Sequence, residues 1–173
     1  MKPRIIGLVG AECTGKTKLA QALARVTDGL WVPEYLRTFC EERGCTPQRE
    51  EQGLILETQH VHILACAAQA RLEGRRFVFC DTTALMTAIY SRYVFGDASL
   101  LPRARQLHRL CHRTLFCRPD LPWQADGIQR DGPEARAAVD RLIEEELALL
   151  GISPQQITGV GTARLEVALS GLP

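Results

Sequence analysis

The segment from Gly10 to Thr17 constrains the fold of this chain more than any other part of its sequence. It consists of Gly-Ala-Glu-Cys-Thr-Gly-Lys-Thr and matches the phosphate-loop pattern G-x-x-x-x-G-K-[ST]. An apolar run over Arg4 to Val9 precedes it, and an amphipathic pattern from about Gly15 to Val26 follows it. This order predicts a buried strand, a glycine loop and a helix, because phosphates are held by N–H groups at a helix N-terminus. The alternative is a glycine turn that enters a helix beside an incidental lysine.

Each residue type in this loop suits the binding of a nucleoside triphosphate. Gly10 and Gly15 allow the backbone to wrap around a phosphate group. Lys16 is expected to reach the β- and γ-phosphates, and the hydroxyl of Thr17 is expected to bind Mg²⁺. Three further residues of the loop are expected to contact the nucleotide: Glu12, Cys13 and Thr14. We therefore predict that the chain binds ATP and Mg²⁺.

Short apolar runs alternate with longer helical patterns along the chain, as in a parallel sheet with crossover helices. The predicted strands are Arg4 to Val9, Leu30 to Pro33, Arg76 to Cys80, Thr114 to Cys117 and Gln156 to Gly159. The predicted helices after the first are Thr46 to Leu72, Ala84 to Tyr93, Pro102 to Cys111 and Pro133 to Leu150, with a weak helix at the C-terminus. Thr46 is expected to cap the long helix, with Pro47 at its first position. The fold is thus predicted to be α/β, with three layers around a five-stranded parallel sheet, in one domain over residues 1–173.

The charge balance argues against nucleic acid or an anionic membrane as a partner. Lys and Arg number 21 and Asp and Glu number 20, so the formal net charge is +1. No apolar stretch reaches the roughly 18 residues that a membrane helix needs. The seven cysteines contain no C-x-x-C pair, which is typical of reduced thiols in the cytoplasm. We expect a cytoplasmic protein with a small-molecule partner, whose oligomeric state depends on side-chain contacts that the sequence does not define.

A phosphate loop also needs a carboxylate that orients Mg²⁺, normally at the end of a neighbouring strand. Asp81 follows the apolar run Phe77 to Cys80 and is predicted to fill this role. Because Thr82 and Thr83 come next, Asp81 could instead cap the following helix.

A carboxylate, an aromatic ring and an arginine follow the second predicted strand. In a parallel sheet this strand end opens on the same edge as the phosphate loop. Glu34 is predicted to accept a proton from a substrate hydroxyl, and Tyr35 to contact the substrate. Arg37 is expected to hold a phosphate or Glu34 itself. The alternative is a surface ion pair between Glu34 and Arg37.

The segment over about 118–133 is rich in Pro, Gly and Asp and is predicted to form a lid. A mobile arginine near the transferred phosphoryl group neutralises charge, and Arg130 and Arg136 are the candidates for that role. Arg136, on the next predicted helix, is expected to contact the nucleotide, and Trp123 and Asp126 the substrate. The alternative is a solvated loop. Three other residues could contact a heterocycle or simply pack: Tyr93, Tyr90 and Gln59.

Taken together, these motifs resemble those of a known kinase family. The phosphate loop, Pro33-Glu-Tyr-x-Arg37, Asp81-Thr-Thr83 and Pro122-Trp-x-x-Asp-Gly-x-x-Arg130 occur in the order found in the ribosylnicotinamide kinase domain of bacterial NAD-biosynthesis regulators and its AAA-type relatives. The resemblance implies a thymidylate-kinase-like core that phosphorylates the 5′-hydroxyl of nicotinamide riboside with ATP and Mg²⁺. It implies that Glu34 and Asp81 match acidic positions near the substrate and the metal, and that Arg130 matches an arginine of the lid. The adenylyltransferase and DNA-binding parts of some relatives are lacking here, so a stand-alone kinase is expected.

Two functions from different classes fit these residues. The first is a small-molecule kinase that acts on a nucleoside-like acceptor. The second is a regulatory ATPase, in which nucleotide turnover controls binding to a protein partner. Glu34 separates them, because its replacement by Gln should abolish acceptor phosphorylation but leave regulatory ATP turnover largely intact.

Overall fold

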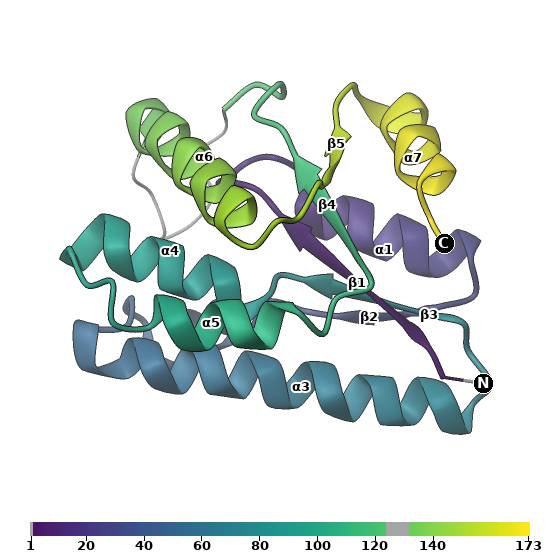
Figure 1. The fold of residues 1–173 in the computed structure, drawn as a ribbon, viewed down its shortest axis with the longest axis horizontal. Coiled ribbons are helices and arrows are strands. Elements are labelled where there is room, and N and C mark those ends of the chain that lie inside the picture. The colour runs from purple at the N-terminus through teal and green to yellow at the C-terminus, as the bar shows by residue number, and fades with distance from the viewer. Residues whose placement is uncertain (1, 124–131) are drawn as a thin grey trace.

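The structure is a computed structural model that describes residues 2–123 and 132–173. Five strands form one parallel sheet in the order β2-β3-β1-β4-β5, so that β1 lies at its centre (Figure 1). The strands are β1 Arg4–Val9, β2 Leu30–Val32, β3 Phe77–Asp81, β4 Arg113–Cys117 and β5 Gln155–Ile157. All five predicted strands are present: β1 has the predicted ends, and the other four differ at an end by one or two residues.

Helices cover both faces of the sheet and complete three layers (Figure 1). On one face lie α1 (Lys16–Val26) and α7 (Gly161–Ser170). The other face is covered by α3 (Gln52–Leu72), α4 (Ala84–Phe95), α5 (Leu101–His108) and α6 (Gly132–Leu149). The short helix α2 (Tyr35–Arg43) follows β2 and contacts α3. The predicted α/β class with a five-stranded parallel sheet is therefore confirmed.

The central strand explains why the sheet is buried on both sides. Successive side chains of a strand point to opposite faces. Ile6 and Leu8 pack in the core beneath α1 and α7, whereas Ile5 and Val9 pack in the cores on the other face. Both sets are buried, which is why the sequence of β1 is a continuous apolar run instead of an alternating one.

The first helix ends at Val26, as predicted, but its last residue does not pack in the core. Its buried residues are Leu19, Ala20, Leu23 and Ala24. Val26 fits the same helical period, but its side chain is 54% exposed. It is the last residue of α1, where the chain turns away toward β2.

The start of the long helix was also predicted wrongly. A 3₁₀ turn, η1 (Arg49–Glu51), comes first, and α3 begins only at Gln52. Gln48 caps this turn, because the Glu51 carboxylate accepts its backbone N–H at 2.8 Å in a capping box. Thr46 and Pro47 therefore lie before the helix. None of the described helices is both long and apolar enough to cross a membrane.

Candidate active site

The phosphate loop joins β1 to α1 at the carboxyl edge of the sheet. Three of its residues have positive φ angles, namely 155° at Gly10, 54° at Cys13 and 75° at Gly15. A Cβ atom on Gly10 would lie 2.6 Å from the carbonyl oxygen of Cys117, so only glycine fits at that position. Backbone turns of this kind direct successive N–H groups to one side and form an anion-binding concavity. The predicted loop thus has the backbone of a phosphate site.

Side chains of the loop stabilise this shape. Lys16 Nζ donates to the carbonyl oxygens of Gly10 and Ala11 at 2.9 and 2.8 Å. The Thr14 hydroxyl donates to the same Ala11 oxygen at 2.8 Å. The ammonium group of Lys16 therefore lies at the loop itself, and Thr17 follows it in the first turn of α1.

Glu12 connects the loop to two other elements. Its backbone N–H donates to the hydroxyl of Tyr90 on α4 at 3.1 Å, and the indole N–H of Trp123 donates to its carboxylate at 3.4 Å. Trp123, at the start of the predicted lid, is thus placed beside the phosphate loop. Tyr93, one turn further along α4, is 38% exposed and makes no hydrogen bond within the described residues. Tyr90 is therefore the tyrosine of α4 that contacts the loop.

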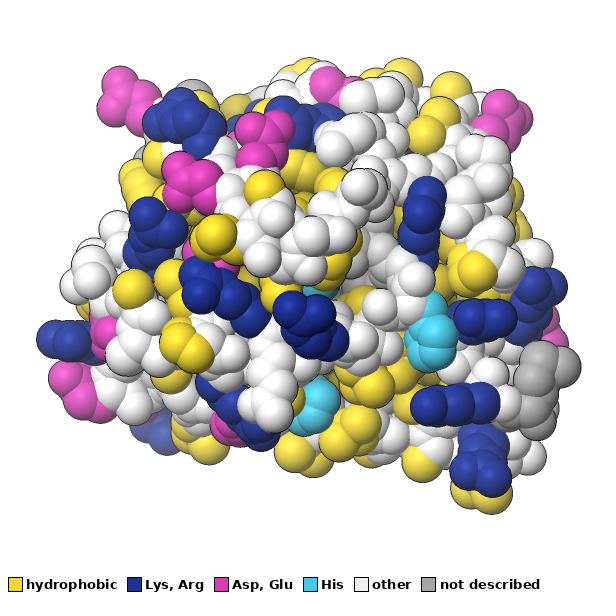
Figure 2. All heavy atoms as spheres, viewed as in Figure 1, with side chains coloured by type: hydrophobic (Ala, Val, Ile, Leu, Met, Phe, Trp, Pro, Cys, Tyr) yellow, Lys and Arg dark blue, Asp and Glu magenta, His cyan; other side chains and the backbone are white. Residues whose placement is uncertain are grey.

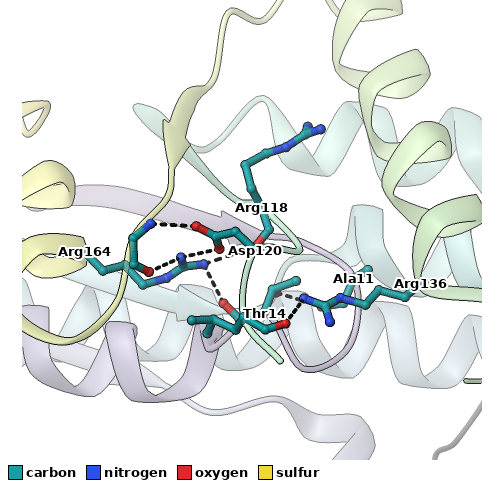
Figure 3. A network of polar contacts seen from close by, with 8 residues as sticks. Ala11, Thr14, Arg118, Asp120, Arg136 and Arg164 are labelled. Atoms are coloured by element: carbon teal, nitrogen blue, oxygen red, sulfur yellow. Dashed lines mark hydrogen bonds and ion pairs between the residues drawn. The ribbon is translucent and has the colours of Figure 1, made fainter. Parts of the chain in front are cut away.

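A buried arginine of α7, Arg164, forms a hydrogen bond to the backbone of the phosphate loop (Figure 3). Arg164 Nη2 donates to the Thr14 carbonyl oxygen at 2.7 Å, and Nη1 donates to Asp120 Oδ1 at 2.8 Å. The other Asp120 oxygen accepts the backbone N–H of Gly159 at 2.6 Å. Arg164 is only 5% exposed, and Asp120 compensates its charge. This cluster joins the phosphate loop, the segment after β4 and the turn before α7.

Arg136 lies at the beginning of α6 and reaches the start of the predicted lid. Its side chain is buried, and Nη2 donates to the carbonyl oxygen of Leu121 at 2.8 Å (Figure 3). Two other residues predicted for the lid, Asp126 and Arg130, lie outside the described residues.

Asp81 is the last residue of β3 and lies opposite Leu8 of β1. It is 1% exposed, and neither carboxylate oxygen has a hydrogen-bond partner among the described residues. Thr83 is the N-cap residue of α4, so Asp81 does not cap that helix. A buried carboxylate with unpaired oxygens is stabilised by a cation, and oxygen atoms are the ligands that Mg²⁺ prefers. Asp81 and the hydroxyl of Thr17 therefore fit a Mg²⁺ ion.

Such an ion would have few protein ligands. The parts of the chain that the structure describes contain no group of three or more His, Cys, Asp or Glu residues arranged for a metal. Mg²⁺ commonly uses one or two protein ligands together with water and substrate phosphates, so the residue set is sufficient beside a phosphate loop.

Glu34 lies between β2 and α2, and its surroundings are partly buried. Its side chain is 17% exposed, and its Oε2 lies 3.3 Å from Arg37 Nε, so the predicted ion pair does form. Burial raises the pKa of Glu34, the charge of Lys16 lowers it, and the charge of Asp81 raises it. The charges of Lys16 and Asp81, which come from two other segments, thus act on the carboxyl group of Glu34.

Gln59 of α3 joins the ends of β2 and β3. Its Oε1 accepts the backbone N–H of Tyr35 at 2.7 Å, and its Nε2 donates to the carbonyl oxygens of Pro33 and Thr82, both at 3.2 Å. Pro33 and Tyr35 flank Glu34 in the chain, and Thr82 follows Asp81. One buried amide therefore holds together the segments that carry Glu34 and Asp81. The ring of Tyr35 packs edge-on against His62 of α3, with ring centroids 5.4 Å apart.

Several contacts of this site were missed at the level of sequence. Gln59 and Tyr90, considered above for a heterocycle, instead bind backbone groups of the site. Arg164 and Asp120 were not identified at all. The one available signal was an arginine among the apolar residues of the weak C-terminal helix, and that pattern does not reveal its partner.

The sequence matches the AAA domain family over residues 5–164. No curated protein matches it.

Solved structures match the fold over nearly the whole chain. The NadR protein in complex with NR has a TM-score of 0.80 and 19% identity, with 98% of this chain and 50% of NadR covered. The NadR protein in complex with NAD and AMP-PNP has a TM-score of 0.77 and 19% identity, with 98% and 48% covered. Thymidylate kinase from Ehrlichia chaffeensis has a TM-score of 0.64 and 17% identity, with 98% and 99% covered.

The chain therefore spans about half the length of the NadR proteins and nearly all of the thymidylate kinase. The predicted resemblance to a NadR-like kinase domain is confirmed in the fold. Together with the family match over residues 5–164, these findings show that the chain belongs to the AAA domain family.

Proposed function

We propose that this chain is an ATP- and Mg²⁺-dependent small-molecule kinase that phosphorylates the 5′-hydroxyl of nicotinamide riboside or a related nucleoside. The observation that carries the proposal is the convergence of Lys16, Asp81 and Glu34 at one edge of the sheet: Lys16 binds the loop after β1, Asp81 ends the neighbouring β3, and Gln59 joins the residues beside Glu34 to Thr82. A phosphate loop alone would suit any nucleotide-dependent protein, whereas a buried carboxylate beside it suits a hydroxyl acceptor. The fold shared with NadR in complex with NR supports a nucleoside-like acceptor.

The nucleotide side of the site would hold the triphosphate of ATP. The N–H groups of the loop bind phosphate oxygens, and Lys16 neutralises charge on the β- and γ-phosphates. Thr17 and Asp81 would hold Mg²⁺, which when bound neutralises phosphate charge. We assign Arg136 to the nucleotide and Arg130 to the predicted lid.

The acceptor side would be organised by Glu34. As the acceptor oxygen bonds to the γ-phosphorus, the bond from that phosphorus to the bridging oxygen breaks and ADP leaves. The proton of the hydroxyl passes to the Glu34 carboxylate. Burial raises the pKa of Glu34 and so makes it a stronger base, while the ion pair with Arg37 orients it. Four further residues are assigned to the acceptor: Tyr35, Tyr93, Trp123 and Asp126.

The cysteines support a cytoplasmic location. All seven lie in the described part of the chain, and none forms a disulfide. Free thiols of this number are typical of a reducing compartment.

A coupled assay for ADP release tests the proposal. Nicotinamide riboside, ribonucleosides and deoxyribonucleosides are each added with ATP and Mg²⁺, and Lys16→Ala serves as the inactive control. The kinase predicts acceptor-stimulated ADP release that Glu34→Gln abolishes while ATP still binds. ADP release that no acceptor stimulates, and that Glu34→Gln leaves intact, would instead identify a regulatory ATPase.

A further inference from the structure

Helix α3 carries apolar side chains on its outer face as well as on the face that packs against the sheet. Its exposed large apolar residues are Leu54, Val61, Leu64 and Leu72. The exposed residues Ala65 and Ala68 lie between them. We call this set the outer stripe of α3.

The outer stripe runs straight along the helix. Spacings of seven, four, three and four residues lead from Leu54 through Val61, Ala65 and Ala68 to Leu72, and these spacings bring side chains to one face of an α-helix. In Figure 1, α3 lies at the outer edge of the molecule, and no described element covers this side. Figure 2, from the same direction, shows hydrophobic side chains exposed along that edge. A helix that is apolar on both faces is normally buried on both, so the stripe has the character of an interface.

The two ends of the stripe differ in charge and in shape. Beyond its N-terminal end lies Glu50, which is exposed and forms no ion pair among the described residues. Beside its C-terminal end is a hollow of about 470 Å³, lined by Lys2, Pro3, Ile5, Ala67, Ala68 and Arg71. Arg71 is exposed and likewise forms no ion pair within residues 2–123 and 132–173. The N-terminal end of the stripe thus has the exposed side chain of Leu54 and a negative charge. The C-terminal end has the hollow and positive charges.

We propose that the outer stripe binds the outer stripe of a second copy of this chain, with the two α3 helices antiparallel around a two-fold axis. An isologous interface requires a surface that is complementary to itself. With Val61 on the two-fold axis, Leu54 lies over the partner's Ala68 and the hollow beside it, and Glu50 lies next to the partner's Arg71. The small residues Ala65 and Ala68 allow the helices to approach closely. This one arrangement gives the apolar side chains and the charge at each end of the stripe a partner on the second copy.

Sedimentation velocity at increasing protein concentration provides the first test. The unmodified chain should change from the 19.2 kDa monomer to a dimer, and Val61→Glu should remain monomeric. Val26→Glu is the matched control, because Val26 is 54% and Val61 57% exposed, but Val26 lies on α1. Circular dichroism establishes that both variants are folded, and Val61→Ser, a milder change, should show an intermediate dimer affinity. A monomer at every concentration, or a dimer that Val61→Glu does not weaken, would overturn the proposal.

Charge reversal tests the antiparallel arrangement. Glu50→Arg alone, and Arg71→Glu alone, should each raise the dimer dissociation constant on the order of tenfold, because like charges then face each other. The double variant restores opposite charges across the axis and should regain the original affinity. Failure of the double variant to recover, with both single variants weakened, would rule out this arrangement.

Discussion

The Nη2 atom of Arg164 lies 2.7 Å from the carbonyl oxygen of Thr14, so that a residue of the last helix holds the phosphate loop in place. The bond is made just before Gly15, whose positive φ angle turns the loop into α1. The same guanidinium group is paired with Asp120, at the base of the predicted lid. Loop geometry and lid base therefore depend on a single side chain.

Replacing Arg164 by Ala should weaken both stability and ATP binding. The Thr14 carbonyl and the Asp120 carboxylate lose a donor, and breaking a buried charged hydrogen bond costs on the order of 2–4 kcal/mol in the free energy of unfolding. Urea unfolding and calorimetric titration with ATP measure the two effects. Arg164→Lys should give values between those of the unmodified chain and those of Arg164→Ala. Replacement of the exposed Arg141 by Ala should change neither the free energy of unfolding nor the ATP affinity. Unchanged ATP affinity in Arg164→Ala would show that the loop does not need this support.

Asp81→Asn should make the nucleotide-free protein more stable and remove its response to Mg²⁺. Both Asp81 oxygens are buried without a hydrogen-bond partner in the described chain, so neutralising the group removes a desolvation cost of about 1 kcal/mol or more. Thermal unfolding with ATP, in the presence and absence of Mg²⁺, is the measurement. The exposed Glu166→Gln is the control and should respond like the unmodified chain. A destabilised Asp81→Asn protein that still responds to Mg²⁺ would contradict the assigned role.

The pH dependence of phosphoryl transfer should follow Glu34. Burial raises its pKa above 4.5, the value of an ordinary glutamate, so kcat should fall as Glu34 takes up a proton on the acid side, with a midpoint above 4.5. Arg37→Ala should move this midpoint to higher pH, because the charge of Arg37 lowers the pKa of Glu34. Glu34→Gln should lose the acid limb and reduce kcat about 10²- to 10⁴-fold.

Glu34 also makes the stability of the fold depend on pH, in the opposite sense to its effect on kcat. The folded state holds the proton on Glu34 more tightly than the unfolded state does, so its contribution to stability is complete below pH 4.5 and is lost as the pH rises through the raised pKa. Urea unfolding of the unmodified chain and Glu34→Gln across this range should therefore show the variant gaining relative stability with rising pH. A kcat profile without an acid limb would remove Glu34 as the base.

His108 should make the fold sensitive to mild acid. Burial lowers its pKa to about 4, and its ring nitrogens bond the hydroxyls of Thr83 and Thr114, both at 3.0 Å. The unfolded chain takes up a proton near pH 6.5 and the folded chain only near 4, so stability should fall by about 3 kcal/mol between these values. Urea unfolding of His108→Gln should show a flatter pH dependence than that of the unmodified chain. Equal slopes for the two proteins would contradict this effect.

The phosphate loop and the sheet could be predicted because their signals are local. The loop pattern from Gly10 to Thr17 occupies consecutive positions, and a buried parallel strand such as β1 is a continuous apolar run. The position of Asp81 at the end of a strand was predicted in the same way, since it follows such a run directly.

Features that depend on distant contacts could not be predicted. The bond between Arg164 and Thr14 spans 150 positions, and no local pattern indicates it. The start of α3 was placed too early because Thr46 and Pro47 form a good N-terminal signal, whereas Gln48 and Glu51 form the capping box that the chain adopts. The helical period continues to Val26 at the end of α1, but the packing does not, and the sequence pattern alone does not show where the packing stops.

The amide of Gln59 uses both of its N–H groups and its oxygen in bonds to the ends of β2 and β3. The segments that carry Glu34 and Asp81 therefore cannot separate unless this buried amide loses its partners. The span between the proposed base and the proposed metal ligand is thus a fixed length, set before any ligand arrives. An acceptor would be selected by whether its hydroxyl group can extend across that length to the γ-phosphate. Selection would then depend on the length of the substrate and be independent of the ring that the substrate carries.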